Sequence, residues 1–215
     1  MTAAGDRGAP AMVLLHALGE QASDWDELVP VFARSFRVVA VDLRGHGSSD
    51  WPGAYSSELM RDDVLALLDV LGLDRVVLVG HSLGGLVGYL VAAAAPARVH
   101  RLVVEDVVPP YARPRPVPDR PDGPLPFDWA VVPAFRAEAD DPAMRWWPLL
   151  ADITAPTLLV GGGPESPVPQ DLIADVAERI PDCTLVTIPA GHYVHRSRPD
   201  DFADAVLGWS AARAS

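Results

Sequence analysis

The chain has 215 residues, of which 49% are hydrophobic, and this suffices for a single folded domain with a substantial core. Acidic residues outnumber basic ones by 29 to 17, and the resulting net charge of -12 argues against a nucleic-acid partner, whose phosphates are also negative. A single cysteine, Cys183, excludes an internal disulfide. Because the sequence shows no basic leader and no long apolar run, we expect a cytoplasmic protein without a membrane partner.

Short apolar runs alternate with longer runs that have helical periodicity. In chain order, the predicted elements are strand 11–17, helix 23–36, strand 37–43, helix 56–73, strand 75–80, helix 83–95, a strand within 98–107, strand 155–163, helix 170–180, strand 183–188 and helix 200–212. Strands that are apolar on both faces and alternate with helices are typical of a parallel sheet covered on two sides. The sequence therefore predicts an α/β protein of three layers, α/β/α, with a mostly parallel sheet of about six strands.

Proline recurs from Pro109 to Pro126 too often for a helix or a central strand, so this segment is predicted to be an extended surface connector. We interpret residues 109–152 as a short lid inserted into one domain that spans residues 1–215. The tryptophans of this lid either pack it onto the body of the domain or line a pocket, and they are Trp129, Trp146 and Trp147.

One serine is enclosed by glycines where a predicted strand meets a predicted helix. Gly80-His81-Ser82-Leu83-Gly84 fits the G-x-S-x-G pattern. Between a strand and a helix, this pattern is typical of a tight turn that raises the serine hydroxyl above the sheet, with glycines where side chains would collide. The start of the helix also offers free N–H groups to an anion. We therefore interpret Ser82 as a candidate nucleophile.

A serine hydroxyl needs a base to become an effective nucleophile, and a histidine is the expected base. His192 lies in the loop between the last predicted strand and the last predicted helix, where it can reach over the strand ends. His195 is the alternative base. The remaining histidines are interpreted as structural or surface residues, and they are His16, His46, His81 and His100.

Five segments of the chain resemble the α/β-hydrolase fold family and occur in the family's order. They are LLHALGE (14–20), DLRGHGSSD (42–50), VGHSLGG (79–85), APTLLVGGGPESPVP (155–169) and AGHYVHRSRPDDF (190–202). By this resemblance, Ser82 is the nucleophile and His192 is the general base. Many relatives begin with two further strands, but only residues 1–10 precede the first predicted strand here, which favours six strands over eight.

The resemblance also implies a triad acid in the loop after the penultimate strand. An ungapped comparison puts Glu165 there, which gives the order Ser82, Glu165, His192, although glutamate departs from the usual aspartate. The rival is Asp106, or less favourably Glu105, after the preceding strand, a placement that also occurs in the family. We take Glu165 as the expected acid and keep Asp106 as its rival.

An oxyanion hole needs two backbone N–H groups directed at developing negative charge. Leu83, the residue after the candidate nucleophile, is one expected donor. The resemblance implies a second donor in the loop after the first strand. The family commonly has His-Gly there and this chain has His16-Ala17, so Leu18 is the expected second donor.

These features predict a serine hydrolase that cleaves an ester, thioester or lactone of a small molecule through an acyl-enzyme on Ser82. No cofactor is expected, because the sequence has no phosphate-binding loop and no dinucleotide-binding motif. No metal is expected either, because His192 and His195 alone are too few ligands.

Other functions remain open on the same residues. The same triad could support acyl transfer, C–C bond hydrolysis, a lyase reaction or a cofactor-free haloperoxidase-type reaction. A ligand-binding protein that keeps the fold without catalysis is a further alternative. Epoxide and haloalkane hydrolysis are disfavoured, because relatives with those activities use an aspartate where this chain has Ser82.

Overall fold

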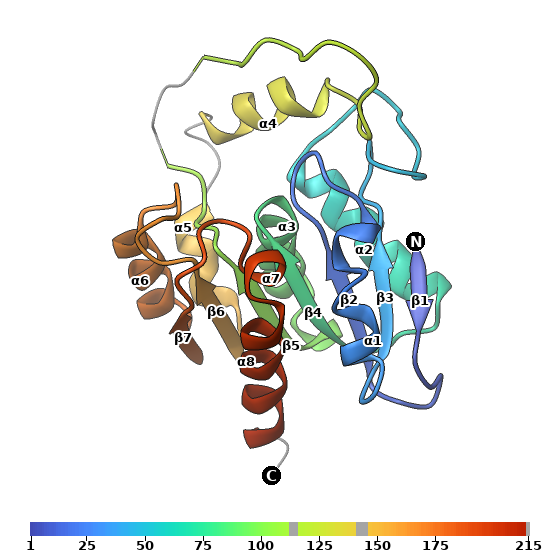
Figure 1. Cartoon of the computed structure of the whole chain (residues 1–215), viewed down its shortest axis with the longest axis vertical. Coiled ribbons are helices and arrows are strands. Elements are labelled where there is room, and N and C mark those ends of the chain that lie inside the picture. The colour runs from blue at the N-terminus through green and yellow to red at the C-terminus, as the bar shows by residue number, and fades with distance from the viewer. Residues whose placement is uncertain (112–115, 141–145, 214–215) are drawn as a thin grey trace.

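The computed structural model describes residues 1–111, 116–140 and 146–213, which form a seven-stranded sheet with helices on both faces (Figure 1). The strand order is β1-β3-β2-β4-β5-β6-β7, and all neighbours pair in parallel except β1 and β3. The strands are β1 Thr2–Ala4, β2 Ala11–Leu15, β3 Arg37–Val41, β4 Val76–His81, β5 Val99–Glu105, β6 Thr157–Gly161 and β7 Cys183–Thr187. The predicted α/β class and mostly parallel sheet are confirmed.

The predicted number of about six strands is too low by one, because β1 adds a seventh. This strand has three residues, is mostly exposed and has no apolar alternation, so its own sequence does not mark it as a strand. It is formed by antiparallel pairing along β3, with Thr2 opposite Ala40 and Ala4 opposite Val38. A short strand at the edge of a sheet also leaves few unpaired backbone groups for another chain to bind.

Helices cover both faces of the sheet and enclose two apolar cores. The helices are α1 Val29–Phe32, α2 Ser57–Val70, α3 Leu83–Ala94, α4 Val131–Ala139, α5 Trp146–Leu149, α6 Gln170–Arg179, α7 Val194–Ser197 and α8 Pro199–Ala212, with 3-10 helices η1 Ala22–Trp25, η2 Pro96–Arg98 and η3 Leu150–Asp152. One core lies between the sheet and α2, α3 and α6, and the other lies between the sheet and α1 and α8. Both faces of the central strands are therefore buried, which explains their continuous apolar sequences.

The helix predicted over residues 23–36 is divided into η1 and α1. Pro30 lies in the first turn of α1, where its missing N–H is tolerated, but it could not have continued a helix that started at residue 23. The prediction of α2 is confirmed. Ser56 caps it by accepting a hydrogen bond from the backbone N–H of Leu59 at 3.1 Å.

The segment between β5 and β6 passes over the carboxyl ends of the strands, where α4 lies above the sheet (Figure 1). Two contacts tie it to the body of the protein. The hydroxyl of Tyr55 donates to Asp128 at 2.6 Å, and Glu138 accepts from the backbone N–H of Ser57 at 3.0 Å. Residues 112–115 and 141–145 of the predicted lid lie outside the described residues.

The tryptophans of this segment pack it onto the body of the protein. Trp146 is buried, and Trp129 and Trp147 lie against the core that contains α2, α3 and α6. None of the three lines the pocket that contains Ser82. Within the described ranges, no helix is both long enough and apolar enough to cross a membrane.

Candidate active site

Ser82 occupies a sharp turn between β4 and α3. Its backbone angles are φ 50° and ψ −111°, a left-handed conformation that costs a non-glycine residue about 1 to 3 kcal/mol. A Cβ atom added to Gly80 would lie 2.3 Å from the carbonyl oxygen of Gly84, and one added to Gly84 would lie 2.2 Å from that of Leu15. The two glycines are therefore required for strand, turn and helix to approach so closely.

His192 forms an ion pair with Asp106, the residue directly after β5. Nδ1 of His192 lies 2.8 Å from Oδ2 of Asp106, whose side chain is fully buried. The carboxylate also accepts hydrogen bonds from the backbone N–H of Gly162 at 2.7 Å, from the hydroxyl of Ser166 at 2.5 Å and from the side-chain amide of Gln170 at 3.3 Å. Burial acts to raise the pKa of Asp106, but the hydrogen bonds from these partners outweigh it, so the net shift is downward. Asp106 is therefore held as a carboxylate.

The expectation that Glu165 is the carboxylate paired with His192 is wrong, because the structure pairs His192 with Asp106. Glu165 lies in the loop after β6 with an exposed side chain. The same loop instead supplies hydrogen-bond donors to Asp106, through Gly162 and Ser166. The rival considered from the sequence thus occupies the position of the acid, and the favoured residue does not.

Ser82 and His192 line the same pocket, which has a volume of about 270 Å³. Its remaining lining residues come from the ends of β5 and β6, from α3 and from α4, and they are Leu86, Val107, Val108, Pro109, Pro110, Tyr111, Arg136, Ala139, Asp140, Pro167, Val168 and Pro169. The walls are largely apolar, with Arg136 and Asp140 as the charged side chains on the α4 side. This volume lies near the lower limit for small-molecule sites.

The two expected oxyanion donors lie on adjoining segments. Leu83 is the first residue of α3, where a backbone N–H has no acceptor within the helix. The loop that carries Leu18 is held against this helix start by a hydrogen bond from the backbone N–H of Gly84 to the carbonyl of His16 at 3.1 Å. The structure thus brings the two segments together, and the donor roles of Leu18 and Leu83 stay predictions.

Two buried histidines fix the loop that carries Leu18. His16 accepts from the backbone N–H of Leu43 at 2.9 Å through Nε2, which leaves Nδ1 to donate to the carbonyl of Ala17 at 2.7 Å. Burial lowers the pKa of His16 to about 4, so its ring is neutral. His46 accepts from the backbone N–H of Gly19 at 3.2 Å. The interpretation of these two histidines as structural agrees with these contacts.

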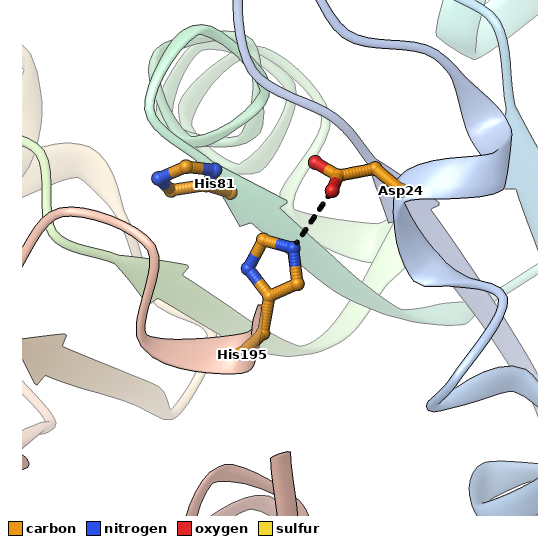
Figure 2. Close-up of side chains that lie close together, drawn as sticks. All are labelled: Asp24, His81 and His195. Atoms are coloured by element: carbon orange, nitrogen blue, oxygen red, sulfur yellow. Dashed lines mark ion pairs between the residues drawn. The ribbon is translucent and has the colours of Figure 1, made fainter. Parts of the chain in front are cut away.

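A buried ion-pair network lies beneath the His192 loop. His195 Nδ1 lies 2.7 Å from Glu105 Oε2, and its Nε2 lies 3.3 Å from Asp24 Oδ1 (Figure 2). Burial acts to lower the pKa of His195, but the two carboxylates outweigh it and raise the pKa to about 9. Arg196 also forms an ion pair with Asp24. His195 is therefore a buried cation that does not line the Ser82 pocket, and it is not placed to serve as the alternative base.

His81 connects this network to the loop that carries His192. Its Nε2 donates to the backbone carbonyl of His192 at 2.8 Å, and burial lowers its pKa to about 4. Sequence reasoning assigned His81 a structural role but missed Glu105 and Asp24 as partners of His195. No local pattern marks them, because the three residues come from β5, from η1 and from α7.

Potential metal ligands occur in this network, because donor atoms of Asp24, His81 and His195 lie within 4.8 Å of one another (Figure 2). The carboxylates of this network already have cationic partners, since protonated His195 pairs with Asp24 and Glu105 and Arg196 pairs with Asp24 and Glu20. A divalent ion would have to displace the proton of His195 and lie beside the guanidinium of Arg196. The group therefore fits an ion-pair network better than a metal centre.

Comparison with known proteins agrees with this architecture. A family model described as alpha/beta hydrolase fold matches residues 10–130, which is more than half of the chain. The chain is 29% identical over 254 residues to sn-1-specific diacylglycerol lipase ABHD11 of Mus musculus, with 96% of this chain and 83% of that protein covered.

Solved structures give the same result. A hydrolase from Pseudomonas aeruginosa PA01 superposes with a TM-score of 0.81 at 27% identity, over 97% of this chain and 92% of that one. Est816, described as an N-acyl homoserine lactone degrading enzyme, superposes with a TM-score of 0.80 at 27% identity, over 97% and 95% of the two chains. On the family match, the sheet topology and the strained serine turn, the chain belongs to the alpha/beta hydrolase fold family.

Proposed function

We propose that the protein is a serine hydrolase that cleaves a carboxylic ester, thioester or lactone through an acyl-enzyme on Ser82. The observation that carries the proposal is the hydrogen-bonded Asp106–His192 pair beside a pocket that Ser82 also lines. A serine with strained backbone, an oriented imidazole and a buried carboxylate are the groups that acyl transfer to a serine needs.

In the proposed first half-reaction, Nε2 of His192 removes the hydroxyl proton of Ser82 while Oγ attacks the carbonyl carbon. The backbone N–H groups of Leu18 and Leu83 bind the oxyanion of the tetrahedral intermediate. His192 then transfers the proton to the leaving oxygen or sulfur, and the bond to the leaving group breaks. Asp106 stays ionised throughout, holds the imidazole in the tautomer with a proton on Nδ1, and stabilises the imidazolium.

In the second half-reaction, His192 removes a proton from a water molecule that attacks the acyl carbon of the ester formed on Ser82. Collapse of the second intermediate returns the proton to Oγ and releases a carboxylic acid. For a lactone, the same steps open the ring and release a single hydroxy acid. No cofactor takes part in either half-reaction.

The dimensions of the pocket favour a small substrate. About 270 Å³ accommodates a short acyl group or a small lactone, and the largely apolar walls favour an apolar acyl chain. The names of two relatives support this reaction class, because ABHD11 is named a diacylglycerol lipase and Est816 is described as an enzyme that degrades a lactone.

The test is the hydrolysis of p-nitrophenyl acetate and labelling by a fluorophosphonate probe, with Ser82→Ala compared with the matched control Ser23→Ala, an exposed serine outside the pocket. We expect Ser82→Ala to lose labelling and to lower kcat/KM by about 10³-fold or more, and Ser23→Ala to behave as the wild type. Product analysis then separates hydrolysis from acyl transfer, C–C cleavage, lyase and haloperoxidase-type reactions. Equal rates in the wild type and Ser82→Ala would favour a ligand-binding protein instead.

A further inference from the structure

The largest of the cavities described lies at the end of the sheet opposite the Ser82 pocket. Its volume is about 610 Å³, and it opens where β2, β4 and β5 begin and α8 ends, near the C-terminus in Figure 1. Its lining residues are Pro10, Ser35, Phe36, Val77, His100, Arg101, Leu207, Ser210, Ala211 and Arg213. It shares no residue with the Ser82 pocket, and none of these lining residues is acidic.

Arg101, on β5, is a buried cation that has no carboxylate partner among the residues that the structure describes. Its exposed fraction is 7%, its Nη2 donates to the backbone carbonyl of Arg213 at 2.9 Å, and its Nε has no hydrogen-bond partner. No ion pair joins it to an acidic side chain in the described parts of the chain. Burial lowers the pKa of Arg101, and the positive charges of Arg213 and Arg75 lower it further. A buried guanidinium in such surroundings is unfavourable unless an anion joins it.

Other arginines of the chain contrast with Arg101. Arg44, which lines a pocket beside α2, forms a two-pronged ion pair with Asp63 at 2.5 and 2.6 Å. Arg213, at the rim of the large cavity, forms an equivalent pair with Asp182 at 2.7 and 2.8 Å. In a chain with a net charge of -12, carboxylates are abundant, yet the most buried of these three arginines lacks one.

A second buried donor lies on the same cavity. Ser210, on α8, is 6% exposed, and its hydroxyl has no hydrogen-bond partner. His100 adds a further polar side chain to the lining. The remaining walls are apolar and include Phe36, Val77 and Leu207. The lining of the cavity therefore combines the positive charge of Arg101 and the hydroxyl of Ser210 with apolar walls, and the volume of the cavity suits a small organic molecule.

We propose that this cavity binds an organic monocarboxylate with an apolar body, with Arg101 and Ser210 receiving the carboxylate and the apolar walls receiving the body. One guanidinium balances one negative charge, so a monoanion fits better than a phosphate dianion. The apolar lining disfavours a small hydrated anion, because a small anion would leave that lining unfilled. The site is independent of the proposed hydrolysis, since it lies at the opposite end of the strands from the Ser82 pocket.

The test uses the fluorescent probe 8-anilinonaphthalene-1-sulfonate, a monoanion with an apolar body, and its displacement by octanoate. We expect octanoate to displace the probe from the wild type and from Ser82→Ala with equal affinity, and neutral octanol to compete about tenfold more weakly. Arg101→Met should weaken octanoate binding by about tenfold or more and Ser210→Ala by about threefold or more. Arg75→Gln, which removes an exposed neighbouring cation, is the matched control and should change affinity by less than about threefold.

Thermal unfolding of Arg101→Met and Ser210→Asp provides a second test, which stands even if one of the two variants does not fold. Octanoate should raise the Tm of the wild type but not that of Arg101→Met. Ser210→Asp supplies a carboxylate within the chain, so it should pair with Arg101, raise the Tm without ligand and abolish octanoate binding. Equal octanoate affinity in the wild type and Arg101→Met, or loss of binding in Ser82→Ala, would overturn the proposal.

Discussion

Replacing Asp106 with asparagine tests which of the two candidate acids supports His192. The Oδ1 atom of Asp106 accepts from the backbone N–H of Gly162 at 2.7 Å and from Gln170 at 3.3 Å. An asparagine must therefore turn its own oxygen to that side. Its NH₂ group then faces Nδ1 of His192, where Oδ2 of the aspartate lies now.

The expected loss follows from this geometry. An NH₂ group donates to Nδ1 and so stabilises the tautomer of His192 that carries its proton on Nε2, which has no lone pair left to accept the proton of Ser82. The imidazolium formed in the reaction also loses the adjacent negative charge. Wrong-tautomer substitutions of this kind lower kcat by about 10⁴-fold, which corresponds to about 5.4 kcal/mol of transition-state stabilisation.

The assay is kcat/KM for p-nitrophenyl acetate, measured for Asp106→Asn and for the matched control Glu165→Gln. Because the Glu165 side chain is exposed, we expect its variant to stay within about twofold of the wild type. The downward pKa shift of Asp106 keeps it ionised above about pH 5, so the comparison holds across neutral pH. Wild-type activity in Asp106→Asn, or an equally large loss in Glu165→Gln, would refute the assignment.

Three further outcomes follow from the geometry of the turn, the ion-pair network and α2. His195 has a pKa of about 9 in the folded protein against an ordinary 6.5, so the stability that its protonated ring contributes is fully present below pH 6.5 and is lost as the pH rises through 9. Chemical denaturation should therefore show that the free energy of unfolding falls on the order of 3 kcal/mol over that pH range. Glu105→Gln should make this fall smaller. Gly84→Ala should destabilise the fold by about 3 kcal/mol or more because of its backbone clash, whereas Gly208→Ala, with open space around it in α8, should stabilise it by about 0.5 to 1 kcal/mol. Ser56→Ala should cost about 1 kcal/mol in the same denaturation assay, and no change would contradict the capping role given to its hydroxyl.

The residues of the candidate site that sequence reasoning favoured are those marked by a pattern in the nearby sequence. Ser82 is marked by glycines whose absence of a Cβ is required by contacts of 2.3 and 2.2 Å, and such contacts arise wherever a strand turns directly into a helix. His192 is marked by its place between the last strand and the last helix. The layered fold was predictable because strands buried on both faces are apolar throughout.

The parts that sequence reasoning ranked second or missed depend on packing between distant segments. Asp106 adopts a left-handed φ of 45°, unusual for a residue other than glycine, and its carboxylate has four hydrogen-bonding partners from the segments that follow β6 and β7. Glu165 matched a family position by counting residues, and counting does not reveal which side chain turns inward. Strand β1 was missed for the same reason, since only its partner β3 makes it a strand.

Asp106 directly follows β5, and this position fixes where it lies relative to Ser82. Strands β4 and β5 are paired side by side up to His81 and Glu105, so Ser82 and Asp106 follow as the next residues of two adjacent strands. The distance between Ser82 and Asp106 is therefore set by the pairing of β4 with β5. The loop after β6 contributes hydrogen-bond donors to Asp106 and does not provide the carboxylate that pairs with His192. We expect that loop to tolerate the exchange of exposed residues such as Glu165, provided that the amide of Gly162 and the hydroxyl of Ser166 stay in place.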